Sequence, residues 1–235
     1  MIYLDNSATS FPKPSEVYDI YKKAIKYYYS NPGRGGYDNA LKTAEKIFEV
    51  REKTAAFFGE KNCENVCFTA NCTAAVNMVI KGMLSDGDHV VISDLEHNAV
   101  LRPLEKLKRQ GKIKYDIFTV DYYDEKKTID SFLRCINTQT KLVFCTHASN
   151  VLGVCLPLQK IGNICKEKHI IFAVDGAQSG GILPLCKEQY HIDYLCLAAH
   201  KGLFAPMGIG ILIGNGAKLN TIVEGGTGSQ SASAV

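Results

Sequence analysis

The sequence lacks several features that mark specialised classes of protein. No apolar run approaches the roughly twenty residues that a membrane-spanning helix needs. No basic leader followed by an apolar core opens the chain. The lysines are scattered among acidic residues and the net charge is only +3, which is too mild a bias to predict nucleic-acid binding. We therefore expect neither a membrane nor a nucleic acid as a partner.

The nine cysteines also lack an arrangement typical of a metal site. Four of them recur at positions 135, 145, 155 and 165, but no Cys-x-x-Cys pair accompanies them. No metal is expected, and buried free thiols are the default interpretation. So many cysteines without an export leader favour a reducing compartment, and we expect a cytoplasmic protein.

What the sequence contains is an ordinary globular composition. Of its 235 residues, 46% are hydrophobic and 22% are charged, which allows one large domain or two small ones. Residues 1–60 read as an extended segment followed by two helices. The first helix is expected from Ser15, a good N-cap, to about residue 29. The second is expected at 39–58, with Gly59 as its stop.

From residue 61 onward, short apolar runs alternate with helical stretches. Strands are expected at residues 66–69, 89–93, 113–120, 142–146, 170–174, 194–198 and 208–213, and helices at 74–84, 98–109, 128–136 and 158–167. Such apolar runs indicate parallel strands covered on both faces. The predicted fold class is α/β, with a mostly parallel seven-stranded sheet and helices on both faces, over residues 61–220. Only about ten residues separate the last two runs, so 208–213 is expected to be antiparallel.

An acidic residue and a lysine follow two of these expected strands. Asp175 ends the run at 170–174, and Lys201 comes shortly after the run at 194–198. Because α/β proteins place their chemistry at the carboxyl ends of strands, both side chains are expected in one crevice. This pair suits pyridoxal phosphate, which needs a Schiff base at one end and a protonated ring nitrogen at the other. A buried Asp–Lys ion pair explains the same residues.

Polar residues follow three further strands. Asn71-Cys72-Thr73 offers either an anion site at a helix N-terminus or an ordinary cap. His97 is interpreted as a base, as a partner that stacks on a flat ring, or as a core residue. A third cluster spans residues 146–150. Five clusters at corresponding places fit a single crevice better than five unrelated caps.

Taken in order, short motifs along nearly the whole chain resemble those of cysteine desulfurases, which are fold-type-I pyridoxal phosphate enzymes of the class V aminotransferase family. The motifs are Tyr3–Thr9, Asn31–Arg34, Asp94–Asn98, Asn150–Gly153, Asp175–Gln178, Ala199–Gly202 and Gly225–Ser229. The Asp-x-x-Gln and His-Lys motifs are the specific part. The resemblance favours the cofactor over the ion pair.

The resemblance implies a role for each matching residue. Lys201 forms the Schiff base and moves the substrate Cα proton, while Asp175 keeps the pyridine nitrogen protonated. His97 stacks on the ring and handles the substrate thiol proton. The other implied cofactor contacts are Gln178 and Asn150 near the phenolic oxygen, Cys72, Thr73 and His200 at the phosphate, and Thr227 at the phosphate of a neighbouring subunit. This last contact implies a homodimer.

Two departures from the family's pattern affect what is expected of this chain. Ala198 stands where the family usually has Ser or Thr, so one phosphate hydroxyl is missing. Family members continue into a small domain that carries the persulfide-forming cysteine and a substrate-binding arginine, and none of the nine cysteines lies in a matching segment. We expect a cofactor-binding large domain without that C-terminal domain, with residues 221–235 as the start of the connection to it.

The expected reaction is therefore that of a cysteine desulfurase. L-cysteine becomes L-alanine, and sulfur passes to an enzyme cysteine as a persulfide and then to an acceptor protein. Because thiolate attack needs an accessible cysteine of low pKa, weak or no turnover is expected from this chain alone. The alternatives are another class V enzyme, such as a selenocysteine lyase or an aminotransferase, and a non-catalytic module for dimerisation or regulation.

Overall fold

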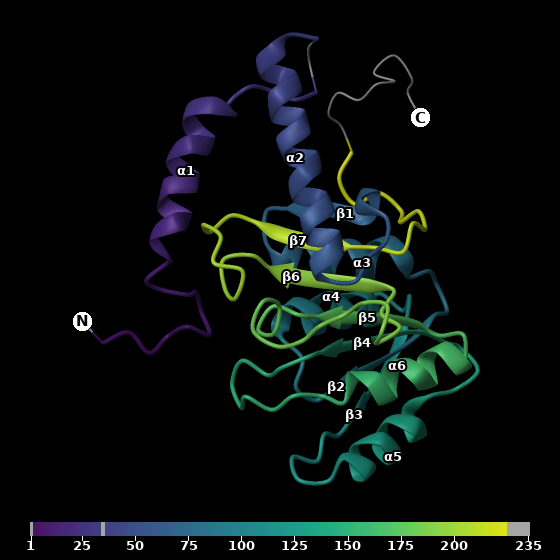
Figure 1. Ribbon diagram of the computed structural model, residues 1–235. Helices are drawn as coiled ribbons and strands as arrows, with labels where there is room; N and C mark the ends of the chain where they lie inside the picture. Colours follow the sequence, from purple (N-terminus) through teal and green to yellow (C-terminus); the bar gives the residue numbers. More distant parts are fainter. Residues whose placement is uncertain (1, 34–35, 225–235) are drawn as a thin grey trace.

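The computed structural model describes residues 2–33 and 36–224, and its elements alternate much as the sequence predicts (Figure 1). The helices are α1 (Ser15–Tyr27), α2 (Asp38–Phe57), α3 (Cys72–Met83), α4 (Asn98–Arg109), α5 (Glu125–Cys135) and α6 (Leu158–Glu167), with a short 3-10 helix η1 (Cys63–Asn65). The strands are β1 (Val66–Thr69), β2 (His89–Ser93), β3 (Lys114–Phe118), β4 (Thr140–Thr146), β5 (Ile171–Asp175), β6 (Tyr194–Ala198) and β7 (Gly210–Ile213).

The strands form one seven-stranded sheet in the order β1-β7-β6-β5-β4-β2-β3. Strands β3, β2, β4, β5 and β6 are parallel to one another. Strand β7 runs antiparallel to both β6 and β1, because the short connection after β6 leaves no room for a covered crossover. The predicted mostly parallel sheet and its antiparallel strand are both confirmed.

Helices cover both faces of the sheet, as predicted. Alternate residues of a strand point to opposite faces, so the central strands contribute side chains to two hydrophobic cores, one on each face of the sheet. Val91 and Val143 belong to the core under α2, α5 and α6. Val90 and Ile92 belong to the core under α3 and α4. Between these two layers the strands are held in register, and the carboxyl ends of the five parallel strands lie along one edge of the sheet.

Some helix boundaries differ from the prediction because side chains cap the backbone. Helix α5 begins at Glu125, three residues before the predicted start at residue 128. Oδ1 of Asp124 accepts hydrogen bonds from the backbone N–H groups of Lys126 at 3.0 Å and Lys127 at 3.2 Å. Helix α3 likewise begins earlier than predicted, at Cys72, because Asn71 is its N-cap. Asx residues before a helix are strong starting signals.

The two N-terminal helices differ in how they join the body of the protein. Helix α1 buries none of its residues, whereas α2 buries Ala40, Thr43 and Ala55. Phe58, just after α2, is 1% exposed and belongs to a sheet core. The division at residues 60 and 220 stays a prediction. No helix within the two described ranges is long and apolar enough to cross a membrane.

Candidate active site

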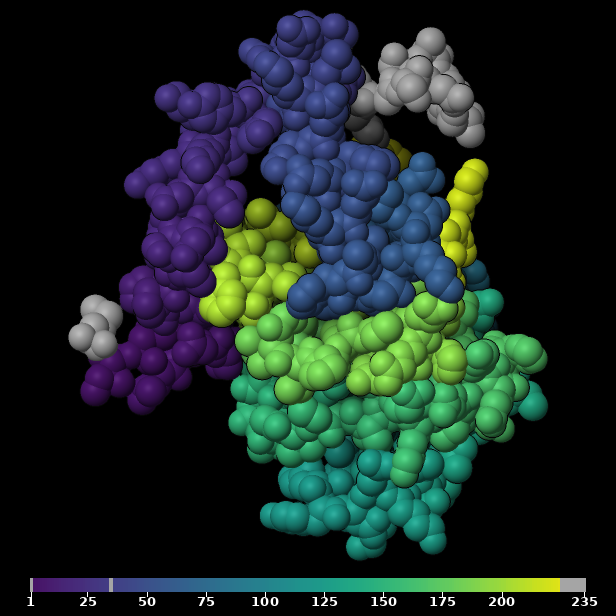
Figure 2. Space-filling model, viewed as in Figure 1, coloured from purple at the N-terminus to yellow at the C-terminus, as the bar shows by residue number. Residues whose placement is uncertain are grey.

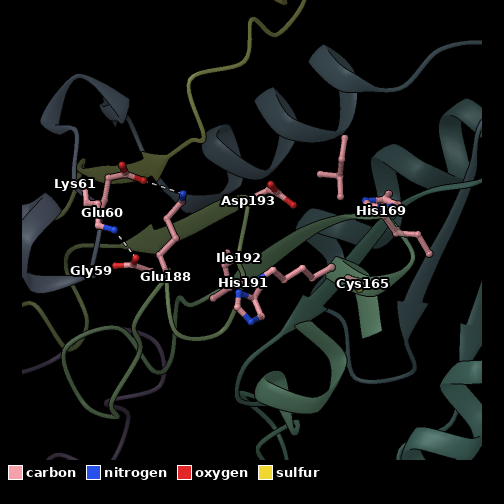
Figure 3. A pocket seen from close by; sticks show the side chains of 13 residues that line it. Gly59, Glu60, Lys61, Cys165, His169, Glu188, His191, Ile192 and Asp193 are labelled. Carbon is pink, nitrogen blue, oxygen red and sulfur yellow. Dashed lines mark hydrogen bonds and ion pairs between the residues drawn. The ribbon is translucent and has the colours of Figure 1, made fainter. Parts of the chain in front are cut away.

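One large cavity lies at the amino ends of β5 and β6, and most of its charges are already paired (Figure 3). Its volume is about 570 Å³. Glu60 and Lys187 form an ion pair at 2.8 Å between Oε2 and Nζ, with both side chains only 10% exposed. Lys61 and Glu188 pair at 2.5 Å on the same rim. This cavity therefore offers few unpaired charges to a ligand.

A smaller cavity of about 390 Å³ lies at the other edge, where the carboxyl ends of β4, β5 and β6 meet. The predicted site residues that line it are Cys72, Thr73, His97, Asn150, Asp175, Gln178, His200 and Lys201. The remaining one, Thr227, lies outside the described residues. The structure thus brings together side chains that follow five different strands, in the single crevice that the sequence predicts.

The N-terminus of α3 forms one side of this cavity. Oδ1 of Asn71 accepts a hydrogen bond from the backbone N–H of Ala74 at 2.8 Å, so Asn71 is an N-cap, as one of the two interpretations of this cluster held. The first-turn N–H groups of Cys72 and Thr73 have no acceptor within the helix, and both residues line the cavity. The cap is compatible with the anion-site interpretation, which stays a prediction, because free N–H groups and the helix dipole attract negative charge.

Asp175 ends β5 at the base of the cavity and is only 5% exposed. Both hydrogen bonds of its carboxyl group within the described residues are accepted by Oδ1, from the backbone N–H of Ala177 at 2.9 Å and from Sγ of Cys72 at 3.5 Å. Burial raises the pKa of this carboxyl above its usual range. A cationic group that arrives beside it would reverse this shift by favouring the carboxylate.

Lys201 lies in the turn after β6 and lines the same cavity. Burial lowers the pKa of its ammonium group, which favours the neutral, nucleophilic amine. Among the described residues, no ion pair within 4.0 Å joins Lys201 to Asp175. The alternative of a buried Asp–Lys ion pair is therefore wrong, and the two groups face a shared space.

His97 lies at the mouth of the cavity as the N-cap of α4. Its side chain is exposed, so the interpretation as a core residue is wrong. Nδ1 accepts a hydrogen bond from the backbone N–H of Ala99 at 3.0 Å. A neutral ring with an accepting Nδ1 carries its proton on Nε2, so Nε2 is the nitrogen that can donate to a ligand.

Sequence reasoning missed the wall of the cavity that the N-terminal segment supplies. Ser7 and Ala8 line the cavity, and the backbone carbonyl of Ser7 accepts a hydrogen bond from Nε2 of Gln178 at 3.0 Å. Nδ1 of His200 lies 3.1 Å from Oγ1 of Thr9. The only sequence signal for these contacts is the Tyr3–Thr9 motif, because hydrophobic periodicity carries no information on where an extended segment docks.

A second enclosed carboxyl, that of Glu96, contacts Thr146, which lines the cavity, and was also missed as a site residue. Its Oε1 accepts hydrogen bonds from the backbone N–H of Thr146 at 2.8 Å and from Oγ of Ser93 at 2.5 Å. Burial raises its pKa to about 8, and the charge of Asp175 adds to this shift. Within the described part of the chain, no cluster of three or more His, Cys, Asp or Glu residues could hold a metal ion.

Comparison with known proteins identifies the family to which this chain is similar. The model of the aminotransferase class-V family matches residues 2–234. The chain is 33% identical to a protein named cysteine desulfurase IscS from Dictyoglomus turgidum, over 96% of this chain and 57% of that protein. It is also 33% identical to a probable cysteine desulfurase from Methanothermobacter thermautotrophicus, over 90% of this chain and 52% of that protein.

Solved structures give the same result. The apo structure of a cysteine desulfurase from Thermococcus onnurineus superimposes with a TM-score of 0.86 at 30% identity, over 96% of this chain and 57% of that one. A structure described as SspA in complex with cysteine superimposes with a TM-score of 0.83 at 27% identity. The chain spans little more than half the length of the curated relatives that it matches. Its sequence match from end to end and its fold show that it belongs to the class V aminotransferase family.

Proposed function

We propose that this chain forms the pyridoxal-phosphate-binding part of a cysteine desulfurase, which converts L-cysteine to L-alanine and passes the sulfur to a thiol as a persulfide. The observation that carries the proposal is that Asp175 and Lys201 line one cavity without forming an ion pair. The family is generally pyridoxal-phosphate-dependent, and the relatives named above supply the specific reaction.

The donor set of the cavity fits this cofactor. An enclosed carboxyl suits a pyridine nitrogen, a lysine amine suits an aldehyde, and the N-terminus of α3 suits a phosphate. Ala198 also lines the cavity and contributes no hydroxyl, so the phosphate depends more on Thr73 and on backbone N–H groups. When bound, the cofactor supplies an electron sink that makes the substrate Cα–H acidic.

The residues that line the cavity have different proposed roles in binding and proton transfer. Lys201 would provide the amine that holds the cofactor aldehyde, and it would also carry the proton removed from the substrate Cα. Asp175 holds a proton on the ring nitrogen, and its own raised pKa returns toward normal as that cation arrives. His97 would hold the cofactor ring in the cavity and would exchange a proton with the substrate thiol through Nε2. Gln178, Asn150 and His200 orient the phenolic oxygen and the phosphate.

Acceptance of sulfur requires a reactive thiolate, and the thiol beside the cofactor is poorly suited to this step. Cys72 lines the cavity, but burial and the nearby Asp175 raise its pKa well above the usual range. The exposed thiols Cys67 and Cys155 do not line the cavity. We therefore expect this chain to bind the cofactor but to release little sulfide. A separate sulfur-acceptor protein completes the proposed reaction.

A homodimer is the second part of the proposal. The resemblance assigns Thr227 to the phosphate of a neighbouring subunit. The N-terminus of α3 is exposed at Thr73, which leaves that side of the cavity accessible to another chain.

The direct test is titration of the purified protein with pyridoxal phosphate. A visible absorbance band from lysine-bound cofactor is expected, and borohydride reduction followed by mass spectrometry should place the label on Lys201. Lys201→Ala should abolish the band, whereas Lys166→Ala, at an exposed position on α6, should leave it unchanged. A protein that stays colourless with excess cofactor would refute the proposal.

Product analysis then tests the substrate. With a thiol reductant present to release the persulfide sulfur as sulfide, alanine and sulfide formed from L-cysteine, even at a low rate, support the desulfurase reaction. Faster release from selenocysteine indicates a selenocysteine lyase, and amino-group transfer to a keto acid indicates an aminotransferase. Cofactor binding without any of these reactions, when a thiol acceptor is present, supports the non-catalytic module instead.

A further inference from the structure

The N-terminal segment from Ser7 to Lys13, here called the docking segment, contacts the turn that carries Lys201. Nε2 of Gln178 donates to its Ser7 carbonyl, which places one end of the segment beside the cavity. At the other end, Oγ of Ser10 lies 2.9 Å from the backbone carbonyl of Lys201 and 3.1 Å from that of His200. Ser10 is only 8% exposed. The docking segment is therefore packed against the proposed cofactor-binding residues.

The carbonyl oxygen of His200 is the centre of these contacts. It accepts hydrogen bonds from the backbone N–H of Ser10 at 3.3 Å, from Oγ1 of Thr9 at 3.1 Å and from Nζ of Lys13 at 2.6 Å. The Lys13 bond is the shortest of them, and hydrogen bonds from an ionised donor are the strong ones. Lys13 is the charged donor among these three, so we take its bond as the strongest single contact to the His200 carbonyl.

Lys13 differs from an ordinary surface lysine in three respects. Its side chain is half-buried, and burial lowers the pKa of its ammonium group. Within the described residues, no carboxylate lies within 4.0 Å of it. Its two hydrogen bonds go to the His200 carbonyl and to Oγ of Ser10 at 2.8 Å. A cation that is partly desolvated to bind one peptide carbonyl stabilises the conformation of that peptide.

We infer that Lys13 is a positioning residue for Lys201: its ammonium group fixes the His200–Lys201 peptide, and so it aims the Lys201 amine into the cavity. The inference rests on the proposed function in one respect, since it takes Lys201 as the cofactor-binding lysine. The contacts themselves do not depend on any ligand.

The test compares Lys13→Met with Lys13→Arg. Methionine keeps the length of the side chain but donates no hydrogen bond, whereas arginine keeps the charge and the donors. Lys22→Met, at an exposed position on α1, is the matched control, and Ser10→Ala is a second disruption of the same contacts. Each variant is checked for folding by circular dichroism.

Two measurements give the outcome. Hydrogen exchange of cofactor-free protein should show faster exchange at residues 199–205 in Lys13→Met, with wild-type rates in Lys22→Met. Absorbance titration should show an affinity for pyridoxal phosphate about tenfold weaker in Lys13→Met, with most of the loss restored in Lys13→Arg. Ser10→Ala should move both readouts in the same direction, which keeps the test decisive even if Lys13→Met does not fold.

The results separate this inference from the proposed function. If the wild type binds the cofactor and Lys13→Met matches it in both readouts, the inference is wrong. Equal losses in Lys13→Arg and Lys13→Met would also overturn it, because a retained donor should rescue the site. If the wild type binds no cofactor, the proposed function fails, and the exchange rates alone decide whether Lys13 holds the turn.

Discussion

At the scale of single residues, the site contains two enclosed carboxyl groups with different surroundings. Asp175 faces the cavity and can gain a cationic neighbour from a ligand. Glu96 faces protein atoms, and its Oε2 is buried without a hydrogen-bond partner among the described residues. Two nearby carboxyl groups disfavour each other's ionisation. Glu96 is therefore protonated near neutral pH, whereas Asp175 is the carboxyl group that can ionise beside a cationic ligand.

This arrangement makes stability depend on pH. The pKa of Glu96 is raised from 4.5 to about 8 in the folded protein, so the folded state holds this proton more tightly than the unfolded state does. The corresponding stability is fully present below pH 4.5 and is lost as the pH rises toward about 8. Glu96→Gln, which cannot ionise, should reduce this decline, as measured by urea unfolding at a series of pH values. Equal slopes for both proteins would contradict the prediction.

At the scale of elements, the antiparallel strand β7 supports the edge of the cavity. Gly210 begins β7 and pairs with Thr69 of β1 and Ala198 of β6. It lies directly against the N-cap of α3, since a Cβ on Gly210 would come 2.2 Å from the backbone carbonyl carbon of Asn71. Absence of a side chain at this position therefore sets how closely α3 approaches the sheet.

Two alanine substitutions test this contact. Gly210→Ala should push α3 away and cost about 1–3 kcal/mol of stability through overpacking, and it should also weaken cofactor binding. Gly214→Ala is the matched control, because a Cβ there meets its nearest neighbour at an ordinary 3.5 Å. Thermal unfolding and cofactor titration give the two readouts. Equal behaviour of both variants would show that Gly210 does not hold α3 in place.

The elements and most of the site were predictable from sequence, because their causes are local. Apolar runs mark the buried strands, and Asn71 marks a helix start. Parallel topology then places the polar strand ends together, which is why Asp175 and Lys201 share a cavity. The contacts of Ser10 and Lys13 with the His200 carbonyl were not predictable, because docking of an extended segment leaves no periodic pattern.

At the scale of the whole molecule, α1 stands apart from the sheet (Figures 1 and 2). It buries none of its residues and exposes apolar side chains. Tyr18, Tyr21 and Ile25 are 47%, 52% and 49% exposed, and their spacing places them on one side of the helix. Leu41 and Phe48 of α2 are 49% and 48% exposed. Apolar surface of this kind favours association, and it agrees with the proposed homodimer.

Analytical ultracentrifugation tests this surface. The wild type should self-associate as its concentration rises, and the double substitution Tyr21→Glu with Ile25→Glu should shift it toward the monomer, because charged side chains resist burial. Lys22→Glu introduces the same charge at the adjacent exposed position and should leave the association unchanged. A wild-type protein that sediments as a monomer at every concentration would contradict the prediction.

The docking segment also determines when the cavity can exist during synthesis. Ser10 leaves the ribosome before the His200 carbonyl that it contacts, which lies 190 residues further along the chain. Chains emerge from the N-terminus, so the docking segment stays undocked until the turn that carries Lys201 has been translated. Loop closure over such a span is a late event. The parallel strands β2 to β5 can thus pair before the binding cavity forms, and a translating chain acquires the site only after residue 201 has emerged.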